Sequence, residues 1–402
     1  MKLLYNLTLN KKVRAFAIMA LALPFGLFAQ SKVIDYDTTI FTKDKIDCIY
    51  NNIILSFNND TLYFIDEKLA HKNKYKKVKI SGLDTKTNKM FSFYFSAKNC
   101  NNLKDKRNHI SRFWIKDNNL YINVSNHIYV FNKNKDNEYV FQKEVNKPKE
   151  GENYDAFPLK DNKILLYKNY LGLFDTFDES TCWLLYDLEK EEVIQRKEYL
   201  NFPSPILTYF GPRDIISISN DRIFYSPANE YKILIYDFNL NLVDSIVHQK
   251  KNWIMVDEEK EKQVLNKYEE PIERLNAFSN YFWDSTSSIM RLFTSNDYLI
   301  VVYKGFNDSI KLEIGLYDVW HKENNEWKLI EEANEETINY IKNKFYPFGA
   351  TLLKDNIIIQ IKEKTPIKRE DYKSEEKYQK AKEKYILNED CLLVIEKFHI
   401  KQ

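Results

Sequence analysis

The sequence has little glycine: only 8 of its 402 residues are Gly, well below the roughly 7% that is usual in proteins. No two of them are closer than ten positions, and they are Gly26, Gly82, Gly151, Gly172, Gly211, Gly305, Gly315 and Gly349. The dinucleotide fingerprint and the Walker phosphate loop both need clustered glycines, because the backbone must approach phosphate closely. The spacing therefore excludes both motifs.

Histidine and cysteine are also scarce, with 6 and 4 residues. The histidines form no HExxH motif, and Cys48, Cys100, Cys182 and Cys391 form no CxxC pair. These spacings argue against a zinc site, so we expect neither a metal nor a cofactor. The G-x-S-x-G motif is absent too, which excludes an α/β-hydrolase.

The sequence also has no large excess of basic over acidic residues. The chain has 60 basic and 58 acidic residues, a formal net charge of +2. A nucleic-acid-binding protein would show a strong basic excess, and we therefore expect no nucleic acid as a partner.

The chain has one long apolar run, Ala15–Ala29, which follows Lys2, Lys11, Lys12 and Arg14. Fifteen residues are too few to span a membrane, which takes about 20. The pattern predicts a signal peptide over residues 1–30, cut near Ala29; the alternatives are a short anchor or a buried helix. Its ending, FAQS, resembles the signal peptides of exported Bacteroidota proteins. Cleavage removes these four basic residues and leaves 56 basic against 58 acidic residues. We therefore expect a periplasmic or extracellular protein without a transmembrane segment.

One pattern repeats six times in the rest of the chain: an apolar strand, a two-residue Asn/Asp turn and a second apolar strand. Such turns between apolar runs are strong hairpin signals. The turns are Asn51-Asn52, Asp117-Asn118, Asp161-Asn162, Asn220-Asp221, Asn296-Asp297 and Asp355-Asn356. The second strands begin at Ile53, Leu120, Ile164, Ile223, Leu299 and Ile357.

A third strand follows in each repeat and often ends in Tyr-Asp or a close variant. The third strands begin at Thr61, His127, Cys182, Lys232, Glu313 and Cys391. A more polar fourth strand, typical of a sheet edge, begins at Lys76, Tyr139, Val193, Val243 and Trp327. The last repeat has no fourth strand of its own, and VIDYDTTIF from Val33 can supply it.

These repeats predict an all-β fold, a six-bladed β-propeller of four-stranded antiparallel blades in a single domain over residues 31–402. A β-sandwich is the alternative. The pattern resembles secreted six-bladed propellers of the TolB-like or NHL-like kind found in Bacteroidota. The resemblance rests on patterning, and it implies no particular catalytic residue.

Topology assigns each loop to one face of such a propeller. The two-residue turns lie on one face, which we call the turn face. The long connections lie on the other, the loop-rich face, and include helical insertions at about 250–287 and 365–386 and a shorter helical candidate, Glu335–Phe345. Loops on a rigid scaffold carry function, so this face is the candidate binding face; the alternative is decoration that covers the channel mouth.

The register also selects two arginines. Arg112 and Arg291 lie six positions before the second turn residue of repeats 2 and 5, which are opposite in a ring of six. They can face each other across the central channel and bind a carboxylate or phosphate group in bidentate fashion. The alternative is that each arginine locks neighbouring blades together. The other candidate ligand-binding residues at this face are Arg213, Asp214, Asp155, Trp283, Tyr209 and Tyr346.

The same register leaves little room for disulfides. Cys182 and Cys391 open third strands on opposite sides of the ring and should not pair. Cys48–Cys391 is the one pair from neighbouring blades, although the two lie in different strands; free or buried thiols are the alternative.

Two functions remain from the sequence. The first is a non-catalytic exported propeller that binds a protein, peptide or glycan through its loop-rich face. The second is an exported enzyme that cleaves a glycan or an ester at the channel mouth, with carboxylates converging from several blades.

Overall fold

The computed structural model describes most of the strands and part of the connections. The described residues are 33–41, 53–58, 60–66, 78–96, 100, 110–124, 126–149, 154–167, 182–198, 215–219, 221–227, 229–268, 270–306, 312–333, 350–354, 356–363, 373–379 and 393–401. The predicted signal peptide over residues 1–30 lies outside them and stays a prediction. No helix among them is both long and apolar enough to cross a membrane.

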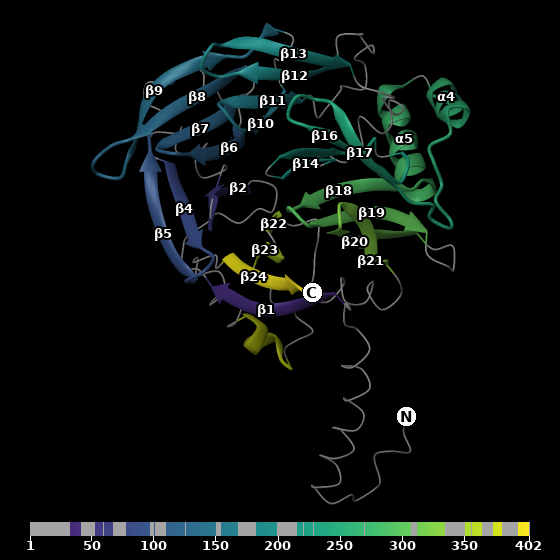
Figure 1. Cartoon of the computed structure of the whole chain (residues 1–402). Coiled ribbons are helices and arrows are strands. Elements are labelled where there is room, and N and C mark those ends of the chain that lie inside the picture. The colour runs from purple at the N-terminus through teal and green to yellow at the C-terminus, as the bar shows by residue number, and fades with distance from the viewer. Residues whose placement is uncertain are drawn as a thin grey trace, which may run out of the picture.

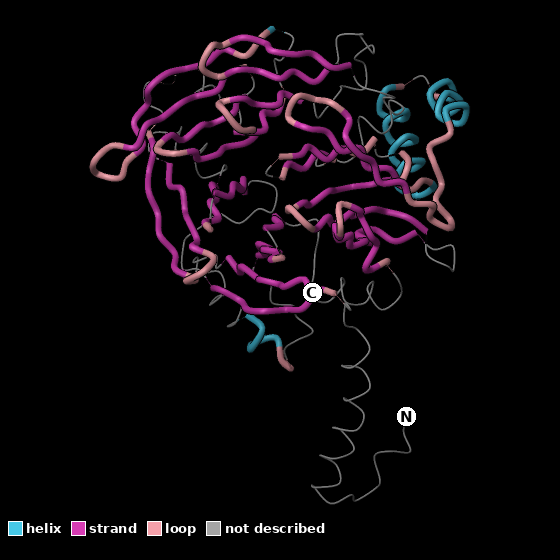
Figure 2. The backbone as a smooth tube through the Cα atoms, viewed as in Figure 1, coloured by secondary structure: helices cyan, strands magenta, loops and turns pink. Residues whose placement is uncertain are grey.

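The fold is all-β, and the described strands fall into six groups of four (Figures 1 and 2). Group 1 holds β2 (Ile53–Asn58), β3 (Thr61–Asp66), β4 (Val78–Asp84) and β5 (Lys89–Phe95). Group 2 holds β6 (Ile110–Lys116), β7 (Asn119–Val124), β8 (His127–Lys133) and β9 (Tyr139–Asn146). A single parallel pairing of Phe95 with Tyr139 joins these two groups into one eight-stranded sheet.

The other four groups are separate antiparallel sheets. Group 3 holds β10 (Asp155–Pro158), β11 (Lys163–Tyr167), β12 (Cys182–Asp187) and β13 (Glu192–Glu198). Group 4 holds β14 (Ile216–Ile218), β15 (Arg222–Tyr225), β16 (Lys232–Asp237) and β17 (Leu242–Val247). Group 5 holds β18 (Ser288–Thr294), β19 (Tyr298–Phe306), β20 (Leu312–Glu323) and β21 (Glu326–Glu331). Group 6 holds β22 (Ala350–Lys354), β23 (Ile357–Glu363), β24 (Leu393–Ile400) and β1 (Ile34–Phe41).

The last group is completed by the first strand of the chain. β1 pairs antiparallel with β24, with Ile34 opposite Ile400 and Phe41 opposite Val394. This confirms that VIDYDTTIF supplies the fourth strand of the last repeat. The first and last described strands of the chain are thereby held in one sheet.

Apolar side chains close the groups into a ring. Each consecutive pair of groups shares one buried cluster of large apolar residues, from groups 1 and 2 through to groups 5 and 6. A further cluster, which includes Leu62, Phe64 and Ile359, lies between groups 6 and 1. The first strands of the groups lie toward the centre of the ring in Figure 1, and the fourth strands lie at its rim. Burial of these strands on both faces explains their near-continuous apolar sequences.

The Tyr-Asp ending of the third strands has a local cause. The carboxylate of Asp187, the last residue of β12, accepts hydrogen bonds from the backbone N–H groups of Glu189 and Lys190 at 2.9 and 3.0 Å. Asp237 at the end of β16 and Asp84 at the end of β4 form the same kind of turn. These backbone bonds also lower the pKa of Asp187. Aspartate therefore fixes the turn into the outer strand.

The strand order shows that the strand positions predicted for the first repeat were wrong. The sequence placed Ile53 in a second strand after an Asn51-Asn52 turn, but β2 is the first strand of group 1 and β3 is its second. The strand expected as the fourth lies in β4, and the outer strand is β5, which the repeat pattern did not predict. Only five residues separate two Asn-rich segments, at 51–52 and 58–60, and the pattern alone chose the wrong one. In repeats 2 to 5 the second, third and fourth strands lie where the sequence placed them.

Two helices, α4 (Glu258–Lys267) and α5 (Pro271–Ser285), lie between β17 and β18, in the range where the sequence predicts a helical insertion. Asp257 caps α4 by accepting hydrogen bonds from the N–H groups of Glu259 and Lys260. Pro271 begins α5, where a proline costs no hydrogen bond. Of the second predicted insertion, residues 373–379 are described and contain a short helical turn; the candidate helix at 335–345 lies outside the described residues.

Candidate functional site

Five polar residues from groups 2 and 3 meet at the loop-rich face, and we call them the Arg112 cluster: Ser111, Arg112, Asn123, Lys147 and Asp155. Ser111 and Arg112 begin β6, and Asn123 pairs with Arg112 near the end of β7. Lys147 directly follows β9, and Asp155 begins β10. Antiparallel pairing brings these strand ends to one side of the sheet. Two of the five, Arg112 and Asp155, are residues that the sequence selected.

Short hydrogen bonds hold the cluster together across the two groups. The Asn123 side-chain amide donates to Ser111 Oγ at 2.6 Å and to the Tyr154 carbonyl at 3.4 Å. The Lys147 ammonium donates to the same carbonyl at 2.7 Å. Burial lowers the pKa of Lys147 to about 7, and the nearby Asp155 carboxylate works against that shift. The chain thus buries a lysine whose charged form is disfavoured.

Two polar atoms of the cluster are buried without a partner. Arg112 Nε and Asn123 Oδ1 have no hydrogen-bond partner among the described residues. The Arg112 guanidinium lies 4.0 Å from the centre of the Phe157 ring in β10. Leaving a buried donor or acceptor unsatisfied costs about 1–3 kcal/mol, and such groups in a native structure call for an explanation. The guanidinium has four more N–H donors on its two terminal nitrogens, and these can bind an anion.

The second predicted arginine lies in another part of the ring. Arg291 is half-buried in β18, and its guanidinium lies 5.4 Å from the ring of Phe293 on the same strand. Arg112 and Arg291 belong to groups 2 and 5, which two groups separate in either direction around the ring. The alternative interpretation is that each arginine locks neighbouring groups together. The Arg112–Phe157 contact between groups 2 and 3 agrees with that interpretation as well.

Trp283 is a packing residue of the helical insertion. It is half-buried on α5 and packs against a cluster formed by Val256, Phe278 and Phe282. The structure therefore places it away from the Arg112 cluster. The other selected residues, Arg213, Asp214, Tyr209 and Tyr346, lie outside the described residues, as do Cys48 and Cys391. Cys100 is fully buried between groups 1 and 2, and Cys182 begins β12.

Lys304 anchors α5 to the sheet. This residue of β19 is fully buried, and its side chain donates to the Phe282 carbonyl and to Thr286 Oγ1 at the end of the helix. Its Nζ lies 3.8 Å from the centre of the Phe282 ring. Burial lowers the pKa of Lys304 to about 7. A neutral amine keeps two N–H groups, which is enough for both acceptors.

This pKa predicts a pH dependence of stability. The unfolded chain binds one more proton than the folded chain between about pH 7 and the usual lysine pKa near 10.4, so stability rises with pH in this window. We expect the free energy of unfolding of the wild type, relative to Lys304→Met, to rise by about 1–2 kcal/mol from pH 7.5 to 9.0. Urea unfolding at both pH values measures it. Lys143→Met removes an exposed lysine and should show no such change; a pH-independent difference for Lys304→Met would refute the assignment.

A third polar cluster, the Asp318 network, joins groups 4 and 5. The fully buried Asp318 accepts hydrogen bonds from the hydroxyl of Tyr231 at 2.5 Å and from Lys250 at 2.8 and 2.9 Å. The Ala333 N–H donates to the same carboxylate at 3.0 Å. Lys250 also pairs with Glu332 at 2.8 Å. These partners satisfy the carboxylate, so the network is better explained as a structural link between the two groups than as a ligand site.

Neither Asn123 nor Lys147 was selected from the sequence. Both lie in ordinary strand-end positions, and no spacing distinguishes them from the many other Asn and Lys residues. Among the described residues, no group of three or more His, Cys, Asp or Glu side chains is arranged to hold a metal ion.

Comparisons with known proteins bear on the fold. No protein-family model matches the chain, and no curated protein is a relative by sequence. A candidate exported protein of Bacteroides fragilis has a TM-score of 0.59 at 11% identity, over 93% of this chain and 97% of its own. That likeness shows a shared fold. Two other structures have TM-scores below 0.5. A DUF4221 family member from Bacteroides vulgatus has a TM-score of 0.48 at 11% identity, over 93% of this chain and 100% of its own. The Pseudomonas aeruginosa periplasmic gluconolactonase PpgL has a TM-score of 0.38 at 9% identity, over 71% of this chain and 72% of its own.

Proposed function

We propose that the chain is an exported six-bladed β-propeller that binds the carboxylate of a peptide or acidic glycan at its loop-rich face without chemical conversion. The six groups of four strands, the apolar clusters between them and the pairing of β1 with β24 support the propeller. The predicted signal peptide supports export. So does the shared fold with a candidate exported protein of Bacteroides fragilis.

The Arg112 cluster carries the ligand proposal. The Arg112 guanidinium packs on the Phe157 ring, and its Nε has no hydrogen-bond partner among the described residues. Arginine binds carboxylates through two parallel N–H donors, and burial strengthens such bonds. An anion that accepts bonds from this guanidinium would also favour the charged form of Lys147, which belongs to the same cluster.

The alternative function, an enzyme of glycan cleavage, needs two carboxylates about 5–10 Å apart. Within the Arg112 cluster the described residues supply one carboxylate, Asp155, together with two basic side chains, Arg112 and Lys147. This composition suits the binding of an anion better than acid–base catalysis by a carboxylate pair.

Isothermal titration with two pairs of probes tests the proposal. The first pair is an acetylated tetra-alanine with a free or an amidated C-terminus, and the second is trigalacturonate with free or methyl-esterified carboxylates. We expect at least one carboxylate probe to bind at least tenfold more tightly than its neutral counterpart, and its affinity to fall as salt rises. Failure of both carboxylate probes to bind, or equal binding of the neutral forms, would overturn the proposal.

A further inference from the structure

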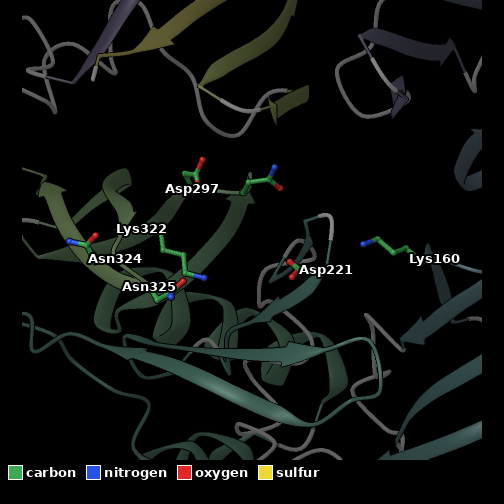
Figure 3. Close-up of a pocket in the computed structure, with 7 residues that line it drawn as sticks. Lys160, Asp221, Asp297, Lys322, Asn324 and Asn325 are labelled. Atoms are coloured by element: carbon green, nitrogen blue, oxygen red, sulfur yellow. The ribbon is translucent and has the colours of Figure 1, made fainter.

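A hollow lies on the turn face, at the opposite end of the strands from the Arg112 cluster. It has a volume of about 610 Å³ and is lined by Lys160, Asp221, Asn296, Asp297, Lys322 and the Asn324-Asn325 turn. These residues come from the first turns of groups 3, 4 and 5 and from the β20–β21 connection. In Figure 3 the side chains of Lys160 and Lys322 reach into the hollow from opposite sides, and Asp221 lies between them. Sites of roughly 300–1,000 Å³ are typical for small ligands.

The lining follows from the way this chain makes its turns. Asn324 and Asn325 have φ values of 51° and 68°, in the left-handed region that glycine adopts most easily. Asp161 and Asn162, next to Lys160, have φ values of 54° and 57°. A chain with 8 glycines uses Asn and Asp instead. These turns therefore carry amides and carboxylates to the mouth of the ring.

The side chains that line the hollow limit the class of ligand that it can bind. Two ammonium groups, two carboxylates and three amides give no net charge, and the Asp221 carboxylate is already paired with Arg222 at 2.9 Å. All seven side chains are polar, and together they offer both donors and acceptors to the hollow. A hydroxyl group both donates and accepts, and a ligand with many hydroxyl groups can use this surface throughout.

We propose that the turn-face hollow binds a neutral oligosaccharide. This site is separate from the Arg112 cluster and does not depend on the function proposed for it. The competing interpretation is that Asn and Asp are present only to make the turns.

The double variant Asn324→Gly/Asn325→Gly separates the two interpretations, because glycine keeps the left-handed turn and removes both amides. The probes are maltotriose, cellotriose, xylotriose and mannotriose, read by saturation-transfer NMR on the full chain. At least one should bind the wild type, and its signal should fall at least fivefold in the double variant. The matched control Asn137→Gly, in the β8–β9 turn with φ of 61°, should leave the signal unchanged.

Three results would overturn this proposal. The first is that none of the four trisaccharides binds. The second is that the signal survives in the double variant while the melting temperature is unchanged. The third is that the zwitterion glycylglycine binds in their place, which would assign the hollow to a charged ligand.

Discussion

Replacing Asp318 by alanine is expected to lower the free energy of unfolding by about 3–5 kcal/mol, because removal of one partner leaves a buried cation uncompensated. Of its two ion pairs, Lys250 would keep the one with the half-exposed Glu332. The hydroxyl of Tyr231 and the N–H of Ala333 would be left without their acceptor as well. Urea unfolding measures the change in stability.

A matched control lies on the same strand. Glu323→Ala breaks an exposed ion pair with Lys328 at 2.7 Å, and such pairs contribute about 0–1 kcal/mol. Where Asp318→Ala does not fold, Asp318→Asn keeps the shape and an acceptor for Tyr231 while removing the charge. A destabilisation by Asp318→Asn no larger than that by Glu323→Ala would contradict the role of this network in joining groups 4 and 5.

Replacing Arg112 by alanine is expected to raise the Kd of the carboxylate probe roughly 10- to 100-fold, since a hydrogen bond to a charged group is worth about 1.5–3 kcal/mol. The melting temperature should change little, because the guanidinium packs mainly on a single ring, that of Phe157. Lys143→Ala removes the same charge from an exposed position in group 2 and should leave the Kd unchanged.

Arg291→Ala tests how far the site extends. When the ligand reaches across the channel, as the sequence register suggests, this variant also weakens binding. When the ligand is held by the Arg112 cluster alone, only Arg112→Ala has an effect. The comparison therefore decides between the two geometries.

Much of the fold could be predicted from the sequence, because two-residue Asn/Asp turns between apolar runs fix where hairpins form. The strands of groups 2 to 5 and the pairing of β1 with β24 follow from that pattern. Group 1 could not be placed, because the Asn-rich segments at 51–52 and 58–60 are equally good turns by sequence. Only the packing of β3 and β4 against group 6 decides between them.

The candidate site was predictable only in part. Arg112 follows from counting along repeats, since a repeat fixes which strand end reaches which face, and Asp155 was selected as a further candidate at the same face. Asn123 and Lys147 owe their properties to burial where groups 2 and 3 pack together, and no local pattern encodes that. Trp283 packs on Val256, Phe278 and Phe282, a contact that the sequence does not encode, because an aromatic residue on an amphipathic helix looks the same whether it faces a ligand or the core.

Arg112 either binds a ligand or locks groups 2 and 3 together. Titration of the carboxylate probe into wild type and Arg112→Ala, with the melting temperature of each recorded in the same buffer, separates these roles most directly. We expect the Kd to rise at least tenfold while the melting temperature falls by less than about 3 °C. An unchanged Kd with a clearly lowered melting temperature would contradict this expectation and would assign Arg112 to the interface between the two groups.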